Sequence, residues 1–321
     1  MNIAFDMMGG DFAPLEAVKG LQIYLSMTSR PATIFCLGNE AQLKPLFELY
    51  SIGADNVKII HAPEEIGYHE PPTRALKEKP KSSISIGFGL LSSGKVDAFI
   101  SAGNTGAMLV GTMYTIKTIE GVSRPTIPTI VPKLNGATGL LLDVGLNVDC
   151  KAEHLNHFAI LGSQYAQHIL NINNPRVGLL NVGEEEGKGN QLCKETYPLL
   201  KENNKINFIG NIEGRDVFQD KADVVVCDGF TGNVILKLAE SVYDVALNRN
   251  VQNDEYFNRF HYEQYGGTPV LGVARPVIIG HGISNDKAFM NMITTAEKMI
   301  DTNLCSRIQE SFNEASSAPI P

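Results

Sequence analysis

Residues 177 to 190 read VGLLNVGEEEGKGN, an apolar run followed directly by a glycine-rich segment. The apolar residues Val177 to Val182 predict a buried strand, and the pattern after Asn190 predicts a helix that Asn190 caps. Lys188 then stands between two glycines at the point where a strand becomes a helix. Free backbone N–H groups at a helix start and a lysine ammonium both favour an anion. The stretch therefore predicts an α/β unit with a phosphate-type site or, alternatively, a mobile surface turn.

The same arrangement recurs at residues 6–11, 101–107 and 228–233, where polar and glycine-rich residues follow an apolar run. Strands that alternate with helices predict right-handed βαβ units and a mostly parallel sheet. Ligands of such sheets bind outside the carboxyl ends of the strands. We therefore expect these loops to converge on one edge of the sheet and to bind a phosphate-bearing ligand.

The element pattern predicts an antiparallel pair at the sheet edge, Ile127 to Val131 with Thr138 to Leu142. Pro14 is expected to begin the first helix. We expect a single α/β catalytic domain over residues 1–310, with two lobes as the alternative, and a frayed tail over 311–321. Helical patterns cover 41–49, 74–91, 108–116, 152–170, 234–247 and 283–308.

Composition excludes several classes of protein. The chain has 321 residues and a net charge of −8, and a nucleic-acid binder needs concentrated positive charge instead. The five cysteines form no Cys-x-x-Cys pair, which is typical of reduced thiols in the cytosol. We find no signal-peptide pattern and no apolar run of the roughly 18 residues that span a bilayer. A cytoplasmic protein is therefore expected.

Other chemistries find weaker support in the sequence. The Gly87-Phe88-Gly89 segment lies inside a helical pattern, so a dinucleotide fingerprint is not met. His154 and His157 could share a helical turn, but no third metal ligand has a matching spacing. A G-x-S-x-G nucleophile elbow is also missing. We therefore expect no cofactor and no metal, and keep a nicotinamide-dependent dehydrogenase as the alternative function.

Seven motifs spread over nearly the whole chain form a highly specific combination. They are DMMGGD (6–11), SAGNTG (101–106), NVDC (147–150), EEGKGN (185–190), EGRD (213–216), CDGFTGN (227–233) and the segment from YGG (265–267) to HG (281–282). With them the chain resembles the bacterial phosphate acyltransferase family of phospholipid synthesis. The resemblance implies a three-layer α/β/α sandwich, similar to isocitrate and isopropylmalate dehydrogenases, and a homodimer.

The resemblance also implies an activity, the transfer of a fatty acyl group from acyl carrier protein to inorganic phosphate, which gives acyl phosphate. Phosphate is itself a nucleophilic anion, so positioning and electrostatics are the remaining requirements. Lys188 would hold phosphate, and Asn233 would donate a hydrogen bond to the thioester oxyanion. The residues expected to bind phosphate or acyl phosphate are Gly9, Gly10, Asn104, Thr105, Gly106, Gly187, Gly189, Asn190, Gly229, Thr231, Gly232 and His281.

The acidic carrier protein requires a local positive surface on this acidic chain. Arg74, Lys77 and Lys81 fall on one face of the helix expected there, and we assign them to carrier docking; an ordinary solvated face is the alternative. A non-catalytic carrier-binding module would keep this patch but tolerate the loss of Lys188. A membrane-bound glycerol-phosphate acyltransferase is a further expected transient partner.

The chain departs from the family pattern at Met7, Glu184 and Ile283. The segment 248–262 is also short beside the family's helical extension, which is linked to membrane association. Peripheral contact with a membrane is therefore only an alternative to the cytoplasmic location.

Overall fold

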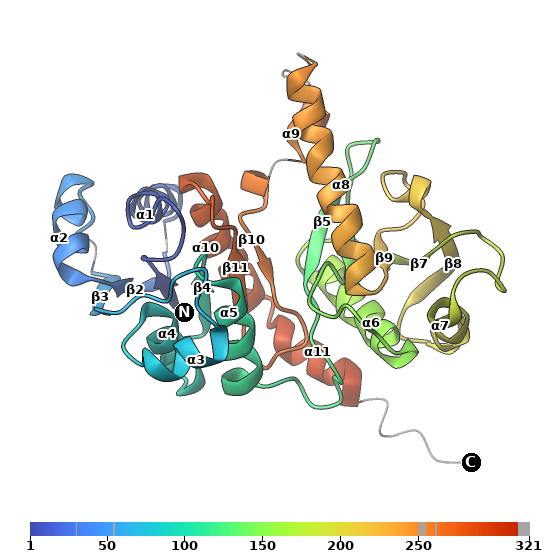
Figure 1. The fold of residues 1–321 in the computed structure, drawn as a ribbon, viewed down its shortest axis with the longest axis horizontal. Helices are drawn as coiled ribbons and strands as arrows, with labels where there is room; N and C mark the ends of the chain where they lie inside the picture. Colours follow the sequence, from blue (N-terminus) through green and yellow to red (C-terminus); the bar gives the residue numbers. More distant parts are fainter. Residues whose placement is uncertain (30, 54, 250, 252–254, 261, 314–321) are drawn as a thin grey trace. The chain divides into compact units, whose positions relative to one another are not determined.

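The computed structural model describes residues 1–29, 31–53, 55–249, 251, 255–260 and 262–313. The chain divides into two compact units. Unit 1 is Met1–Lys117 with Tyr262–Asp301, and unit 2 is Thr118–His261 with Thr302–Pro321. Each unit contains its own sheet with helices on both faces (Figure 1).

Unit 1 begins with three strand–helix repeats and ends with the segment that returns after unit 2. Its elements are β1 (Asn2–Asp6), α1 (Leu15–Met27), β2 (Thr33–Gly38), α2 (Glu40–Leu49), β3 (Val57–His61), α3 (Pro72–Glu78), α4 (Ser83–Ser92), β4 (Ala98–Ser101), α5 (Thr105–Gly111), the π-helical turn η1 (Thr112–Ile116), the short turn η3 (Tyr262–Gln264), β10 (Gly267–Pro269), β11 (Val277–Gly280) and α10 (Asp286–Asp301).

The sheet of unit 1 has the order β10-β11-β4-β1-β2-β3 and is parallel except for β10. Successive residues face opposite helix layers, because side chains alternate along a strand. Phe5 of β1 contacts Phe289 of α10 with ring centroids 5.5 Å apart, and Phe99 of β4 contacts Phe88 of α4 at 5.0 Å. The strand order reverses between β1 and β4, and such switch points hold ligands in open α/β sheets.

Unit 2 repeats the alternation of strands and helices, and its last helix comes from the C-terminal part of the chain. Its elements are β5 (Pro128–Pro132), β6 (Thr138–Leu142), α6 (Ala152–His168), β7 (Arg176–Asn181), α7 (Gln191–Glu202), β8 (Asn207–Glu213), the short turn η2 (Gly214–Asp216), β9 (Val224–Val226), α8 (Gly229–Asn248), α9 (Glu255–Asn258) and α11 (Leu304–Asn313).

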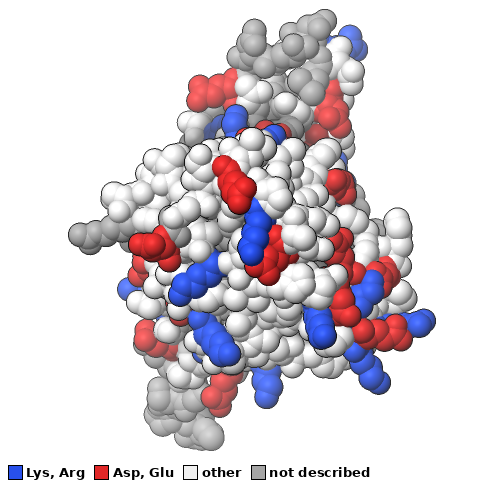
Figure 2. Space-filling model, turned by 90° about the vertical axis from the view of Figure 1, so that its left-hand side faces the viewer, with Lys and Arg blue, Asp and Glu red and all other residues white. Residues whose placement is uncertain are grey.

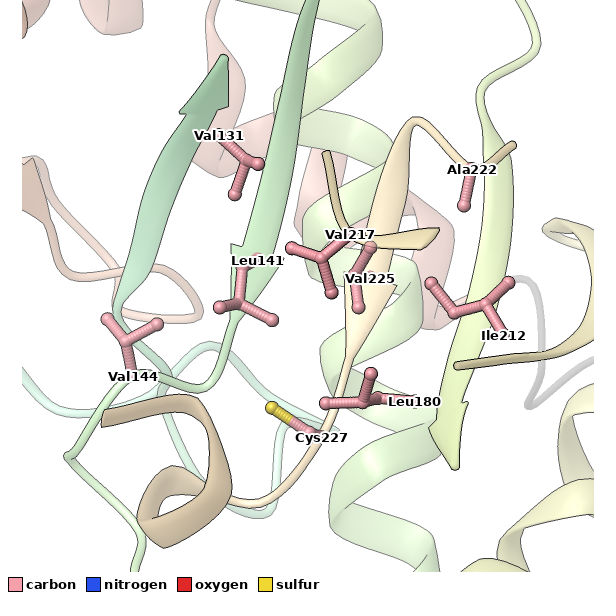
Figure 3. Close-up of a cluster of buried hydrophobic side chains, with 9 residues drawn as sticks. All are labelled: Val131, Leu141, Val144, Leu180, Ile212, Val217, Ala222, Val225 and Cys227. Carbon is pink, nitrogen blue, oxygen red and sulfur yellow. The ribbon is translucent and has the colours of Figure 1, made fainter. Parts of the chain in front are cut away.

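The sheet of unit 2 has the order β5-β6-β9-β7-β8 and is parallel except for β5. One face carries the buried cluster drawn in Figure 3, which includes Leu141 and Val225 and packs against the apolar face of α8. The other face packs on α6, where Gly162 lies so close to Leu142 and Val224 that an added Cβ would be 2.7 Å from the Val224 side chain. Burial of both faces explains the nearly continuous apolar strands.

Several sequence predictions are confirmed by these elements. The α/β/α class with mostly parallel strands is observed, and β5 and β6 form the predicted antiparallel pair, with β5 at the sheet edge. Asn190 caps α7 by accepting a hydrogen bond from the Cys193 N–H at 2.8 Å. Pro14 lies at the N-cap position of α1.

Other predictions were wrong in their boundaries. The helix expected over 74–91 is two helices, because the backbone turns at Lys79 and Pro80 carries no N–H for a continuing helix. The final helix over 283–308 also divides, at Asn303, which has the left-handed φ of 51°. α11 extends to Asn313, three residues into the expected tail, and residues 314–321 lie outside the described residues.

The largest difference concerns the number of sheets. We expected all glycine-rich loops on one edge, whereas the loops divide between two sheets, one in each unit. In segment 248–262 the structure has α9, and residues 250, 252–254 and 261 of that segment lie outside the described part. None of the helices described is both long and apolar enough to be a membrane span.

Candidate functional site

The loop that contains Lys188 follows β7 in unit 2, at a switch point of the strand order. β8 lies on one side of β7, while β9, which follows β8 in sequence, lies on the other side. Lys188 is exposed, and its Cγ and Cδ lie over Gly183, within 3.5 Å of where a Cβ of that residue would be. Within the described part of the chain, its ammonium has no hydrogen bond or ion pair.

Two buried asparagines hold this loop from below. The Asn181 side chain, at the end of β7, donates to the Lys188 carbonyl at 3.1 Å and accepts from the Val182 N–H at 2.8 Å. Asn211 of β8 donates to the Glu185 carbonyl at 2.9 Å. The backbone around Lys188 is therefore fixed, although the side chain itself is free to meet a ligand.

Two of the three acidic residues of the same loop, Glu184 and Glu186, are turned toward other lysines. Glu184 pairs with Lys221 at 2.6 Å, and Glu186 pairs with Lys201 at 3.0 Å. Both pairs are solvent-exposed, so each contributes little to stability. Because these two carboxylates pair with Lys201 and Lys221, neither of them forms an ion pair with the Lys188 ammonium.

A second loop of unit 2 follows β9, the strand next to β7, and leads into α8. Asp228 caps this helix through the Thr231 N–H at 2.9 Å and the Thr231 hydroxyl at 2.8 Å. Asn233 is exposed at the fifth position of α8, and no described residue hydrogen-bonds its side chain. Lys188 and Asn233 therefore belong to loops at the carboxyl ends of neighbouring parallel strands.

Two glycines allow α8 to begin against the segment after β6. A Cβ on Gly232 would lie 1.9 Å from the Asp143 carbonyl oxygen, and one on Gly229 would lie 2.6 Å from the Asn147 carbonyl oxygen. Neither position can take a larger side chain without a backbone shift. Gly229, Thr231 and Gly232 were predicted to bind phosphate, and here they also shape the loop that presents Asn233.

Asp143 connects the segments around this loop. Its fully buried carboxylate accepts hydrogen bonds from the Thr126 hydroxyl (3.1 Å), from the Ile127 N–H (3.0 Å) and from the backbone and side chain of Asn147 (2.6 and 3.0 Å). Four donors satisfy a charge that would otherwise be costly to bury. The carboxylate therefore fixes the backbone against which Gly229 and Gly232 pack.

In unit 1 the switch point lies between β1 and β4, and Asp6 and Ser101 meet there. The Ser101 hydroxyl donates to the buried Asp6 carboxylate at 2.7 Å and accepts from the Gly103 N–H at 3.0 Å. Burial raises the pKa of Asp6, and hydrogen bonds from its neighbours oppose that rise. Gly9 packs so closely that a Cβ would be 2.5 Å from the Gly103 nitrogen.

The other predicted residues of unit 1 surround this contact. Asn104 is buried: its carbonyl caps α5 through the Ala107 N–H at 2.9 Å, and its amide donates to carbonyls of the segment 67–70, at 2.8 Å for Gly67. Thr105 is exposed and Gly106 half-buried at the start of α5. The Asn104 side chain is thus committed to loop structure, while the adjacent backbone stays accessible.

The loop after β11 approaches the loop after β1. The Asp11 N–H donates to the Gly282 carbonyl at 2.7 Å, and Gly10 has the left-handed φ of 115°. His281 is half-buried at the end of β11. Tyr68 donates to the Ala102 carbonyl at 3.1 Å, and burial together with the nearby Asp11 charge raises the pKa of Tyr68 to about 12. The phenol is therefore a neutral donor at physiological pH.

The three residues assigned to carrier docking do not share one helix. Arg74 and Lys77 lie on α3, whereas Lys81 follows the end of that helix, so the predicted single face was wrong. Arg74 pairs with Glu78 at 2.9 Å on the surface. Figure 2 views the side on which α2 lies in Figure 1, and basic side chains there are interspersed with acidic ones rather than gathered in one field.

The described residues offer no cluster of three or more His, Cys, Asp or Glu side chains that could hold a metal ion. His154 instead accepts from the Lys151 N–H at 3.1 Å at the start of α6, and His157 contacts Phe312. Thiol nucleophiles also lack support. Burial raises the pKa of Cys36, Cys150, Cys193 and Cys227 above the usual thiol range, which disfavours the reactive thiolate.

Sequence reasoning missed the residues that position the loops, namely Asp6, Ser101, Asp143, Asn181 and Asn211. Four of them share a signal, since each is a polar residue at or just beyond the end of a buried apolar strand. Asn211 gave no such signal, because it lies within β8.

Comparison with known proteins gives a family. The family described as "Fatty acid synthesis protein" matches residues 1–307. A phosphate acyltransferase of Dictyoglomus turgidum is 42% identical over 332 residues, which cover 98% of each chain. One from Aquifex aeolicus is 42% identical over 328 residues, covering 96% of each.

Solved structures resemble the fold at much lower sequence identity. A phosphotransacetylase from Streptococcus pyogenes has a TM-score of 0.65 at 18% identity and covers 94% of each chain. A 4-hydroxythreonine-4-phosphate dehydrogenase from Klebsiella pneumoniae has a TM-score of 0.54 at 12% identity, covering 92% of this chain and 96% of its own. These likenesses support the α/β fold, while the full-length sequence matches carry the assignment. The chain therefore belongs to the fatty acid synthesis protein family, among the phosphate acyltransferases, and is an acyltransferase.

Proposed function

We propose that the chain transfers a fatty acyl group from the thioester of acyl carrier protein to inorganic phosphate, giving acyl phosphate for phospholipid synthesis. The observation that carries this proposal is the loop around Lys188, which places an ammonium that no described residue pairs with between two glycines at the carboxyl edge of a parallel sheet. Such an edge combines backbone N–H donors with a positive charge, the chemistry that binds phosphate.

The proposed reaction proceeds by direct attack. A phosphate oxygen adds to the thioester carbonyl, the tetrahedral intermediate carries the negative charge on the former carbonyl oxygen, and the carrier's thiolate leaves as the C–S bond breaks. The Lys188 ammonium would bind phosphate, and the Asn233 amide would donate to the oxyanion. Removing one oxyanion donor costs about 10²- to 10³-fold in rate in known enzymes. Direct attack needs no protein nucleophile, which agrees with the raised pKa values of the thiols of Cys150, Cys193 and Cys227.

The proposal is tested by phosphate-dependent formation of acyl phosphate from acyl carrier protein, with hydroxylamine trapping of the product. Formation of product that saturates with phosphate supports it. Turnover that is independent of phosphate would contradict it. A nicotinamide titration separates the dehydrogenase alternative, and retention of carrier binding without any turnover in the wild type would favour the non-catalytic module.

We also propose a homodimer formed through α8. Phe230, Val234, Leu238 and Val245 are each more than half exposed, at 62%, 52%, 66% and 60%. At 100° per residue they fall within about 80° of one another around the helix. An exposed apolar stripe of this kind, interrupted here by Ser241, is characteristic of an interface between subunits.

The remaining partners are proposals that follow from the reaction. Carrier protein would dock at Arg74, Lys77 and Lys81, and the acyl phosphate would pass in the cytoplasm to a membrane-bound glycerol-phosphate acyltransferase through transient contact. Charge attraction supports the first of these, because carrier proteins of fatty acid synthesis are acidic.

A further inference from the structure

Unit 1 contains an apolar pocket that none of the predicted site residues except Lys77 touches. It has a volume of about 380 Å³ and is walled by α3, α4, α5 and η1. This volume lies within the range of about 300–1,000 Å³ that is typical of small-molecule sites. Its lining includes Leu76, Phe88, Val110 and Tyr114.

We propose that this pocket binds the alkyl chain of the acyl group carried by acyl carrier protein, an inference that rests on the function proposed above. The walls offer mainly carbon atoms, which suits a chain that gains free energy from every methylene removed from water. Lys77 lies at the same pocket with an exposed ammonium, so a cation is available for the anionic carrier.

The position of the pocket along α5 supports this occupant. α5 starts in the loop that follows β4, at the switch point of the unit 1 sheet, and its last residues line the pocket. Val110 is five residues beyond Thr105, or roughly 7 Å along the helix axis. The pocket therefore begins roughly 7 Å along α5 from the carboxyl edge of the unit 1 sheet, a distance that an alkyl chain can span.

Local backbone features keep the pocket open. A Cβ on Gly111 would lie 2.1 Å from the Phe88 ring, so the glycine allows that ring to form one wall. Gly89 is exposed and lines the pocket, and a Cβ there would meet no heavy atom of the described residues within 4 Å, so this position has room for a side chain. η1 supplies Tyr114 and Thr115, and π-helical turns occur often at functional sites.

Gly89 provides the test, because a larger side chain there enters the pocket without a backbone clash. We expect Gly89→Leu to lower kcat/KM for palmitoyl carrier protein by about 10- to 60-fold, since each excluded methylene is worth about fourfold. For hexanoyl carrier protein the change should stay below about twofold. Thr115→Phe, which fills the pocket from the opposite wall at an exposed position, should shift the chain-length profile in the same direction.

Two control variants separate filling of the pocket from other effects. Ser92→Leu adds the same side chain to an exposed position of the same helix outside the pocket and should leave both rates unchanged. Gly89→Ala should also leave them unchanged while raising the melting temperature, because alanine favours a helix more than glycine does.

The outcomes distinguish this inference from the proposed function. Failure of the wild type to form acyl phosphate from either carrier would refute the function, and the inference with it. Normal wild-type turnover with equal losses for both chain lengths, or with no loss in either filled variant, would overturn the pocket assignment alone. A filled variant that changes only the oligomeric state, measured by light scattering, would instead mark this face as a subunit interface and overturn the inference.

Discussion

Gly187 and Gly189 flank Lys188, and their different surroundings make a pair of alanine substitutions a direct test of the loop. A Cβ on Gly189 would lie 2.3 Å from the Asn181 side-chain oxygen and 2.8 Å from the Cys193 Cβ. Gly189 also has φ of 96°, in the left-handed region. A Cβ on Gly187 meets no heavy atom within 4 Å.

These surroundings give opposite expectations for stability. Gly189→Ala should lower the free energy of unfolding by about 2–3 kcal/mol, because the left-handed conformation costs an L-residue about 1–2 kcal/mol and the Asn181 hydrogen bond is disturbed. Gly187→Ala should leave stability unchanged, or raise it by about 0.4–1 kcal/mol through the unfolded chain.

Activity should fall in both variants, for different reasons. Among the described residues, no neighbour requires a glycine at 187, so we attribute it to close approach of phosphate to the backbone. The added methyl of Gly187→Ala should keep phosphate out of reach of one backbone N–H. A hydrogen bond to a charged ligand is worth about 1.5–3 kcal/mol, so the phosphate KM should rise by about 10- to 100-fold. In Gly189→Ala the altered backbone should misplace Lys188 and lower kcat as well.

The assay combines urea unfolding with initial rates over a range of phosphate concentrations. Gly53→Ala is the matched control, because a Cβ there also meets nothing within 4 Å and the residue lies in none of the candidate loops. A stable Gly187→Ala variant with the wild-type phosphate KM would refute the placement of phosphate at this loop.

Three further predictions follow from the same structure. Lys188→Ala and Asn233→Ala should each lose most activity but keep the wild-type melting temperature, since both side chains are exposed. Lys188→Arg should also be impaired, because a guanidinium is bulkier than an ammonium. Wild-type rates in both alanine variants would remove these loops from the mechanism. Burial lowers the pKa of Lys133 from 10.5 to about 8. Between pH 8 and pH 10.5 the unfolded state therefore binds more protons than the folded state. The free energy of unfolding should rise with pH across this range by up to about 3 kcal/mol. Urea unfolding should show that rise missing in Lys133→Met, and equal slopes would contradict it. Replacement of Arg74 and Lys81 by Glu should raise the KM for acyl carrier protein and reduce the salt dependence of that KM, while the phosphate KM stays nearly unchanged. A larger shift in the phosphate KM would place these residues at phosphate instead.

Much of the fold could be predicted because its signals are local. Apolar runs gave the strands, a polar side chain before a helical pattern gave the Asn190 cap, and the close spacing of β5 and β6 gave an antiparallel pair. The break between α3 and α4 is also local, but Pro80 can either bend or end a helix. The structure shows that α3 ends here, because the backbone of Lys79 leaves the helical conformation and Ser82 caps the start of the new helix α4.

The division into two sheets could not be predicted from the same signals. Periodicity identifies a strand but does not tell which strands become its neighbours. β9 inserts between β6 and β7 although it follows β8 in sequence, and β11 joins the first sheet after the whole of unit 2. Such pairings depend on contacts between residues far apart in sequence.

The candidate site could be predicted only as a set of loops. Asp143, Asn181 and Asn211 act through the register of the strands that carry them, and register becomes visible only in three dimensions. Their hydrogen bonds explain why glycine-rich loops can hold one conformation at all. The sequence predicts which loops bind the ligand, and the structure shows which hydrogen bonds hold those loops.

In unit 2, the residues that hold the loops differ from the residues that are proposed to contact the substrates. Asp143 lies just beyond the end of β6, and Asn181 lies at the end of β7. Both are buried, and their side chains form hydrogen bonds with backbone groups of the loops. Asp228 follows β9, and both of its carboxylate oxygens accept hydrogen bonds from Thr231 in the cap of α8. Lys188 and Asn233 are exposed, and their side-chain polar groups have no hydrogen-bond partner in the described chain. A cation and a neutral donor left open on neighbouring strand ends match the two charges of the proposed reaction, one on phosphate and one on the developing oxyanion.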